Sequence, residues 1–445
     1  MSAQPHSCPN RSGRPRFLTE QCEAIVGIAE IGAGGEDSGM HPELRSSLTM
    51  VGLVANALAP RIRSRLLTIP SFSAGWLVTE GAGPILAVRG ARFLGRAKRG
   101  EYREPGGLLR AGAELVALGA VGKLIVDALR VDEEFEAVLC PVLGEEFVAN
   151  RPRSVRLGAL IPLLQGTRKS SVVRTVKYHE EGGWRNTLDI YESKVESPNG
   201  PGQLRPCVVE IHGGGWVIGN KTQQGIPLLN HMVGLGWVGI NINYRLAPRS
   251  KMPAQVIDCK RAIAWIREHA DSLGIDPDMI VVTGGSAGGH LSSLTALTAN
   301  DPQFQPGFED KDTSVAGAVP FYGVYDLLDT ERAMVPGFLE YIEDYVLGAK
   351  IKDSKELLTS VSPRFRVHPD APPMMMIHGT VDTLAPVEQG RAFARILADV
   401  SEHTVLFVEC AGANHAFDVF PSVRSVRTIE FVERFLEAVR IGLIK

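Results

Sequence analysis

One serine lies in a setting in which a serine side chain can act as a nucleophile. Gly284, Ser286 and Gly288 form the pattern G-x-S-x-G. The β-branched run 279–282 precedes this pattern, and the sequence from 291 onward is typical of the start of a helix. At such a strand-to-helix turn the serine oxygen is exposed beside the N–H groups of the helix. The pattern therefore predicts that Ser286 is a nucleophile, the alternative being a glycine-rich turn with an incidental serine.

A serine hydroxyl needs a general base, and that base needs a third group to orient it. Asp382 follows the predicted strand 374–378, and His415 follows the predicted strand 404–408. The chain order Ser286, Asp382, His415 is the order expected of an α/β-hydrolase. We therefore predict that these three residues form a catalytic triad.

Acyl transfer also requires N–H donors that point at the oxyanion of the tetrahedral intermediate. The glycines Gly213, Gly214 and Gly215 directly follow the predicted strand 208–211, and glycine lets backbone N–H groups approach a substrate closely. We predict an oxyanion hole from this loop and the N–H of Ala287, with Gly213 either a donor or part of the turn. The alternative is that the glycines form only a flexible loop.

Five motifs in sequence order resemble those of the hormone-sensitive-lipase-like esterases: His212 to Trp216, Asn243 to Pro248, Gly284 to Gly289, His378 to Asp382, and Asn414 to Phe417. Within that family the chain looks most like esterases of lipid-rich actinobacteria that carry a long N-terminal extension. The resemblance covers residues 170–445. It implies an α/β-hydrolase fold, ester hydrolysis without a cofactor, and the triad and oxyanion roles given above.

The resemblance also implies a cap over the acyl pocket, built from the N-terminal region and the insertion after Asp326. Two departures from the family pattern stand out. Gly285 precedes the serine where many relatives have Asp or Glu, and the sequence after the acid, 383–386, differs from the usual continuation. The first departure removes a carboxylate near the serine, and the second puts the position of the Asp382 loop in doubt.

The elements that must position these residues alternate along the second part of the chain. Helices are predicted over 254–269, 387–400 and 423–443, and strands over 172–178, 187–192, 208–211, 238–243, 279–283, 315–322, 374–378 and 404–408. A partly helical insertion is predicted over 326–362. Buried strands alternating with helices predict an α/β fold with a mostly parallel sheet and helices on both faces.

Composition sets the wider limits. The chain has 445 residues, of which 44% are hydrophobic, enough for a large core and a second region. We divide it into a polar, poorly ordered stretch 1–45, a helical region 46–165 with a linker from 130, and a catalytic domain 166–445. The net charge of −3 argues against a nucleic-acid partner. The six scattered cysteines argue against a thiolate metal site, so no metal is expected, and the resemblance implies that no cofactor is needed.

The region 48–129 places apolar helical stretches beside arginine clusters. Such a pattern is typical of a segment that binds anionic membrane surfaces, and also of an ordinary helical subdomain with a basic rim. The N-terminus has no apolar core of a secretory signal, and no stretch reaches ~18 apolar residues. We therefore expect a cytoplasmic, peripheral-membrane or cell-envelope protein, acting on a small-molecule or lipid ester.

Two other functions remain open. An amidase or formamidase would use the same triad and oxyanion hole, and a non-catalytic membrane-surface protein could reuse the scaffold. The sequence leaves the acyl-chain preference and the oligomeric state undetermined. Tyr244 and Arg245 are expected to brace the oxyanion loop, and Trp216 either to line the alcohol side of the pocket or to cap the core. Structural hydrogen bonds are expected for His290, Asp326 and Asp418.

Overall fold

The computed structural model describes residues 40–60, 67–150 and 171–445. Within them the strands form one eight-stranded sheet in the order β1-β2-β4-β3-β5-β6-β7-β8. Strand β2 is antiparallel to both neighbours, and the strands from β4 to β8 run parallel. The strands are β1 (Ser171–Lys177), β2 (Thr187–Ser193), β3 (Arg205–Ile211), β4 (Val238–Ile242), β5 (Ile275–Gly285), β6 (Gly317–Phe321), β7 (Met374–Gly379) and β8 (Val405–Cys410).

This sheet confirms the predicted fold class and all eight predicted strands. Strand side chains alternate between two hydrophobic cores, because successive residues of a strand point to opposite faces. Val209 and Val282 belong to one core, whereas Val208 and Val281 belong to the other. Both faces of the sheet are therefore buried, as expected for parallel strands.

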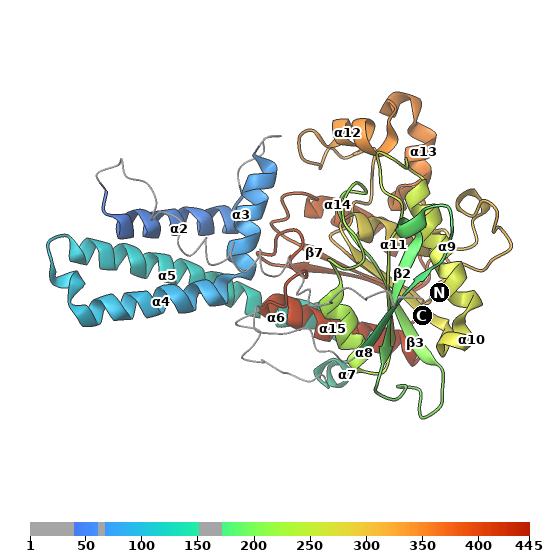
Figure 1. The fold of residues 1–445 in the computed structure, drawn as a ribbon, viewed down its shortest axis with the longest axis horizontal. Helices are drawn as coiled ribbons and strands as arrows, with labels where there is room; N and C mark the ends of the chain where they lie inside the picture. The colour runs from blue at the N-terminus through green and yellow to red at the C-terminus, as the bar shows by residue number, and fades with distance from the viewer. Residues whose placement is uncertain (1–39, 61–66, 151–170) are drawn as a thin grey trace, which may run out of the picture.

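Helices cover both faces (Figure 1). One core includes residues of α9 (Ala254–Glu268), α11 (Ala287–Leu297) and α14 (Val387–Val400). The other includes residues of α8 (Ile226–Gly234) and α15 (Val423–Arg440). Short helical segments complete the domain at η4 (Gly183–Asn186), α10 (Ala270–Leu273) and η5 (Pro302–Phe304).

The insertion predicted between β6 and β7 is present and partly helical. It packs into the first core through buried side chains such as Phe338, Ile342 and Val346. Its elements, and the turn that follows them, are α12 (Phe338–Tyr341), η6 (Ile342–Leu347), η7 (Ile351–Asp353), α13 (Lys355–Ser360) and η8 (Pro363–Phe365).

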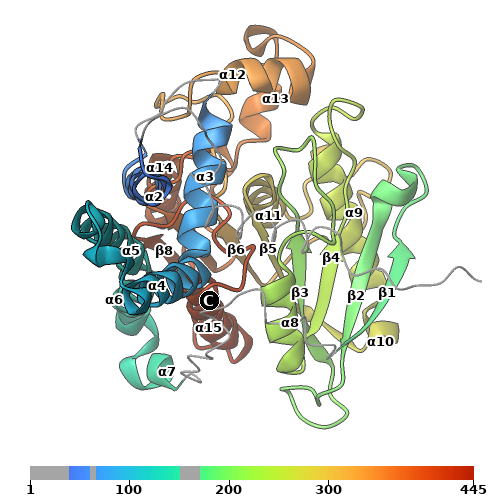
Figure 2. The same cartoon turned by 60° about the vertical axis from the view of Figure 1, so that its left-hand side comes forward.

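The N-terminal region is helical, as predicted, and projects away from the sheet (Figure 1). Its helices share a small core that includes Met50, Val54, Ile85 and Val121. Figure 2 shows α3 in front of the hydrolase body, and Figure 1 shows α4 and α5 extending outward from it. The elements are α2 (Pro42–Leu58), α3 (Thr68–Glu80), α4 (Ala82–Arg99), η1 (Glu101–Arg103) and α5 (Gly107–Leu129). Among the described helices, none has both the length and the apolar character to cross a membrane.

The prediction of a linker from residue 130 is wrong for the residues up to Ala149. Helices α6 (Val131–Leu143) and α7 (Glu145–Ala149) occupy this stretch, and Phe135 stacks on Phe431 of α15 with ring centroids 4.7 Å apart. The acidic residues Asp132, Glu133 and Glu134 occupy the first turn of α6, where they favour a helix N-terminus. The division near residue 165 lies outside the described residues. The poorly ordered stretch was predicted to reach 45, but α2 already begins at Pro42.

Candidate active site

Ser286 occupies a tight turn between β5 and α11. Its backbone has φ 61° and ψ −120°, a conformation that a non-glycine residue adopts only where the surrounding structure enforces it. The neighbours must be small, because a Cβ on Gly284 or Gly288 would lie 2.3 Å or 1.9 Å from the carbonyl oxygen of Ile211. The glycines of the G-x-S-x-G pattern therefore let β5 and α11 pack tightly against β3 while the turn presents Ser286 at the end of its strand.

His415 and Asp382 form a buried hydrogen-bonded pair. His415 Nδ1 lies 2.7 Å from Asp382 Oδ2. The other carboxylate oxygen, Oδ1, accepts the backbone N–H groups of Leu384 and Ala385, both at 2.8 Å. Leu384 and Ala385 lie in the stretch that differs from the usual family sequence, and they hold the carboxylate through backbone N–H groups. Their side chains do not take part in these hydrogen bonds.

The electrostatic surroundings keep Asp382 ionised. Burial alone would raise the pKa of this carboxyl, but the charge of His415 and hydrogen bonds from His378 and His415 outweigh burial and lower the pKa below its usual range. An ionised carboxylate only accepts hydrogen bonds, so His415 Nδ1 must carry the proton. The other ring nitrogen, Nε2, is then the one free to accept a proton.

Strand order brings Ser286, Asp382 and His415 to one edge of the sheet. They follow β5, β7 and β8, which lie parallel with only β6 between β5 and β7. Tyr322, at the end of β6, lies between the serine turn and the histidine. Its ring centroid is 4.6 Å from that of His415, and its hydroxyl lies 2.5 Å from where a Cβ of Gly285 would be. A larger residue at Gly285, as in many relatives, would therefore have to displace Tyr322.

The glycine loop after β3 lies against the serine. A Cβ on Gly213 would come within 3.2 Å of the Ser286 Cβ. Gly213 N–H donates to Gln224 Oε1 at 2.7 Å, so this group is already used within the protein. Gly214 and Gly215 have φ 112° and 59°, values that a β-carbon would disfavour. In the described parts of the chain neither of their N–H groups donates to a protein acceptor.

Two tyrosines fix this loop. Tyr244 donates its hydroxyl to the carbonyl oxygen of His212 at 2.8 Å, and its ring stacks on the His212 ring. Tyr341, from α12 of the insertion, donates to the carbonyl oxygen of Gly215 at 2.7 Å. Tyr244 thus braces the loop as expected. Arg245 instead pairs with Asp258, with Nη2 and Oδ1 2.8 Å apart.

Other polar residues near the site have structural partners, as predicted. His290 accepts a hydrogen bond from Trp216 Nε1 at 3.1 Å and lies 2.7 Å from the Val361 carbonyl oxygen through its other nitrogen. Trp216 is only 2% exposed and belongs to the core. Asp326 accepts the backbone N–H groups of Leu328 and Thr330. Asp418 accepts the hydroxyl hydrogen bond of Tyr322.

Helix α3 contributes to the site in a way that the sequence analysis did not predict. Phe72 packs edge-on against the ring of His415, with centroids 6.1 Å apart. Trp76 stacks on Phe420 at 4.6 Å. Further along α3, Glu80 pairs with Arg424 at 3.1 Å, and both side chains are almost fully buried. No local pattern predicts such contacts, because more than 300 positions separate the partners. In the described ranges no group of His, Cys, Asp and Glu side chains could hold a metal ion.

Comparison with known proteins agrees with the fold. The BD-FAE family model matches residues 188–397. Esterase LipQ of Mycobacterium tuberculosis is 39% identical over 69% of this chain and 75% of the relative. The probable carboxylic ester hydrolase LipM of the same organism is 38% identical over 86% of this chain and 90% of the relative. The chain belongs to the hormone-sensitive-lipase-like family of α/β-hydrolases.

A solved structure supports the same assignment. Esterase 2 of Thermogutta terrifontis aligns over 62% of this chain and 96% of that chain, with a TM-score of 0.51 and 28% identity. The relatives are esterases, and this protein is accordingly an enzyme of the carboxylesterase class. The non-catalytic alternative is set aside by these comparisons.

Proposed function

We propose that this enzyme hydrolyses carboxylic esters through an acyl-enzyme formed on Ser286. In this proposal His415 is the general base and Asp382 orients it. The observation that carries the proposal is the 2.7 Å hydrogen bond between His415 Nδ1 and Asp382 Oδ2, at the same sheet edge as the serine turn. Serine becomes an effective nucleophile only when such a base is positioned beside it.

The reaction follows from the protonation states of these groups. Ser286 Oγ attacks the ester carbonyl carbon while His415 Nε2 takes the serine proton. The resulting imidazolium is stabilised by the ionised Asp382, which lies on its other side. His415 then returns the proton to the departing alcohol oxygen. A water molecule attacks the acyl-enzyme by the same route, releasing the carboxylic acid and restoring the serine.

The oxyanion of each tetrahedral intermediate would be stabilised by the N–H groups of Gly214, Gly215 and Ala287. Gly214 and Gly215 belong to the glycine loop, which lies against Ser286. Ala287 is the first residue of α11, where a helix N–H has no partner within the helix. The loss of one such donor typically costs about 3–4 kcal/mol of transition-state stabilisation. Gly213 is assigned to the turn, because its N–H is bonded to Gln224.

The substrate is proposed to be an ester with an apolar acyl group, including lipid esters. Phe72 and Trp76 of α3 cover the His415 loop with aromatic surface, and Tyr341 of the insertion adjoins the glycine loop. The Thermogutta terrifontis esterase has been solved with butyrate and with propionate bound. A series of nitrophenyl esters of increasing chain length, together with matching anilides, measures the acyl preference and separates esterase from amidase activity.

The test of the assignment is covalent labelling by a fluorophosphonate. The Thermogutta terrifontis esterase has been solved after phosphonylation by sarin, which supports the use of this reagent class. We expect one label on the full-length protein and none on Ser286→Ala. Ser272→Ala, at an exposed serine, is the matched control and should label normally. Labelling of folded Ser286→Ala at the wild-type rate would refute the nucleophile assignment.

A further inference from the structure

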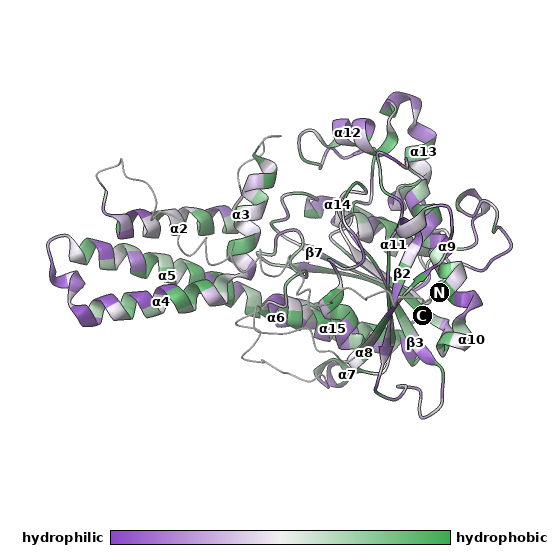
Figure 3. Cartoon of the chain, viewed as in Figure 1, coloured by the Kyte–Doolittle hydropathy of each residue, from purple (hydrophilic) through white to green (hydrophobic). Residues whose placement is uncertain are grey.

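Helix α5 exposes a row of apolar side chains to solvent. The exposed fractions are 83% for Leu108 and 64% for Leu109, and the row continues through Leu115, Val116 and Val126, each more than half exposed. We call these five residues the α5 face. Figure 3 shows hydrophobic residues along α5, in the part of the molecule that projects from the hydrolase body. Such surface costs free energy in water and commonly marks an interaction site.

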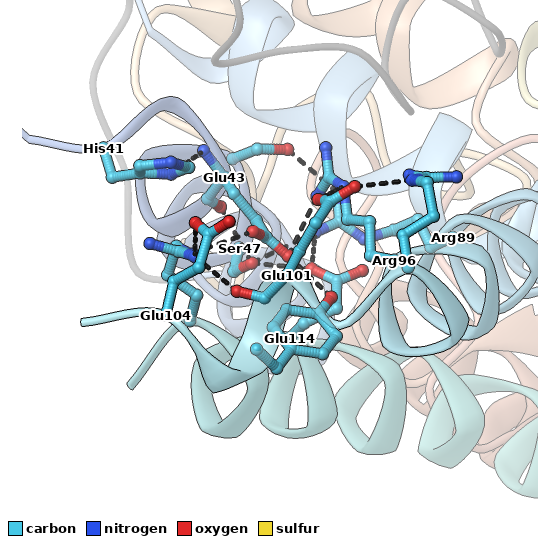
Figure 4. A network of polar contacts seen from close by, with 12 residues as sticks. His41, Glu43, Ser47, Arg89, Arg96, Glu101, Glu104 and Glu114 are labelled. Atoms are coloured by element: carbon cyan, nitrogen blue, oxygen red, sulfur yellow. Dashed lines mark hydrogen bonds and ion pairs between the residues drawn. The ribbon is translucent and has the colours of Figure 1, made fainter. Parts of the chain in front are cut away.

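The interior of the same helices is rich in charge. Glu114 pairs with Arg89 and accepts a hydrogen bond from Ser47 at 2.6 Å. Glu43 pairs with Arg96 at 2.9 Å and accepts the hydroxyl of Tyr102 at 2.7 Å. Figure 4 shows this network between the helices. The carboxylates are about 5% exposed.

These helices keep an apolar core, but they also bury charged residues and expose leucines and valines, which departs from the usual pattern of a helix in water. Buried charges are costly unless they are paired, and here the buried carboxylates have cationic partners within the bundle. Because the pairs lie inside, the outer apolar surface can enter a low-dielectric phase without taking unpaired carboxylates with it.

The remaining charge on the outside is mainly positive. The carboxylates Glu43, Glu80, Glu114 and Asp127 are buried, which leaves Glu101 and Glu104 at the tip of the α4–α5 pair. The exposed basic side chains over the same described helices are Arg92, Lys98, Arg99, Arg103 and Lys123. Two of them already have acidic partners, because Arg99 pairs with Glu101 at 2.6 Å and Lys123 pairs with Asp127 at 2.8 Å. Basic groups beside an apolar helix face complement an anionic lipid surface and repel a second copy of the same face.

We propose that the α5 face docks on the surface of an anionic lipid bilayer. Its leucines and valines enter the interfacial layer, and the exposed basic side chains of α4 contact lipid phosphates. Helix α3 connects this bundle to the His415 loop through Phe72 and Trp76, so docking would also hold the active site close to the bilayer. The proposal concerns a surface distinct from the active site and does not depend on the activity assigned above.

The test is flotation of the full-length protein with phosphatidylcholine vesicles that contain or lack phosphatidylglycerol. We expect the protein to float with the anionic vesicles, and less so as salt rises. The triple variant Leu108→Ser/Leu109→Ser/Leu115→Ser should bind about tenfold more weakly or worse, because binding scales with buried apolar area. The control variant Val173→Ser/Leu204→Ser/Leu443→Ser changes three apolar residues outside the bundle that are 40% to 49% exposed, and it should float like the wild type.

A second variant separates charge from apolar contact. Lys98→Gln/Arg103→Gln should lower binding to anionic vesicles about fivefold or more per charge at low salt, with little change toward neutral vesicles. Circular dichroism establishes that each variant is folded. The proposal is overturned if the triple variant and its control float equally. It is equally overturned if ultracentrifugation shows a wild-type dimer that the triple variant dissociates and neither protein floats.

Discussion

Trp76 of α3 donates its indole N–H to the carbonyl oxygen of Ala416 at 2.8 Å, across 340 positions of the chain. Ala416 directly follows the proposed base, His415. The bond therefore ties an N-terminal helix to the loop that must hold the imidazole toward Ser286. It makes the N-terminal region part of the active-site architecture, in addition to any role as a cover over the substrate.

Trp76→Phe should lower kcat for short nitrophenyl esters by up to about tenfold, because a small displacement of a catalytic group weakens its alignment. The phenyl ring keeps part of the stacking on Phe420 and removes only the N–H donor. KM should change less than kcat, since uniform substrate binding is not affected. Trp184→Phe, at an exposed tryptophan, is the control. A change confined to KM would assign Trp76 to substrate binding instead.

Ser286→Ala and His415→Ala should each reduce kcat by about 10⁵-fold or more, and the double variant should lose little beyond either single change. The reason is that nucleophile and base act as one unit. Steady-state kinetics on the three purified variants measures this directly. Multiplicative losses in the double variant would show that the two residues act independently.

Asp382→Asn should reduce kcat by about 10³–10⁴-fold while the protein stays folded. An amide can offer an N–H to His415 Nδ1 and so favour the tautomer in which Nε2 is protonated and cannot act as a base. The loss should be smaller than that of His415→Ala. We would measure kcat beside thermal unfolding. An Asn variant with near wild-type kcat would exclude Asp382 as the orienting group.

His290 should make the protein less stable in acid. Burial lowers its pKa to about 4 in the folded protein, from an ordinary value of 6.5. Below pH 6.5 the unfolded chain therefore binds a proton that the folded protein does not, and stability falls as the pH drops toward 4. The contribution amounts to ~3 kcal/mol. Urea unfolding at several pH values should show a shallower slope for His290→Gln. Parallel wild-type and variant curves would contradict this prediction.

Chelators should leave ester hydrolysis unchanged. The proposed chemistry uses a serine, an imidazole and a carboxylate, and the described residues hold no cluster of metal-ligating side chains. The measurement is the initial rate before and after dialysis against EDTA. Inhibition that added zinc reverses would overturn the metal-free mechanism.

The sequence by itself determined the parts of the protein that depend on local patterns. The period of apolar residues identified the eight strands, and the glycines around Ser286 and after β3 identified two turns that only small residues can form. Asp382 and His415 each follow a predicted strand. Because the carboxyl ends of parallel strands lie at one edge of a sheet, both residues are expected near Ser286. These inferences need only the residue types and their spacing.

Only the tertiary structure decided which distant residues meet. The sequence predicts a linker from residue 130, whereas residues 131–143 form a helix that packs against α15, a contact that only the tertiary structure shows. The contacts of Phe72 and Trp76 with the His415 loop likewise join segments more than 300 positions apart. In the N-terminal helices the sequence shows the residue types but not their partners. The orientation in which the helices pack decides which charges pair inside and which side chains face outward. Local spacing constrains the face of one helix, whereas burial depends on its neighbours.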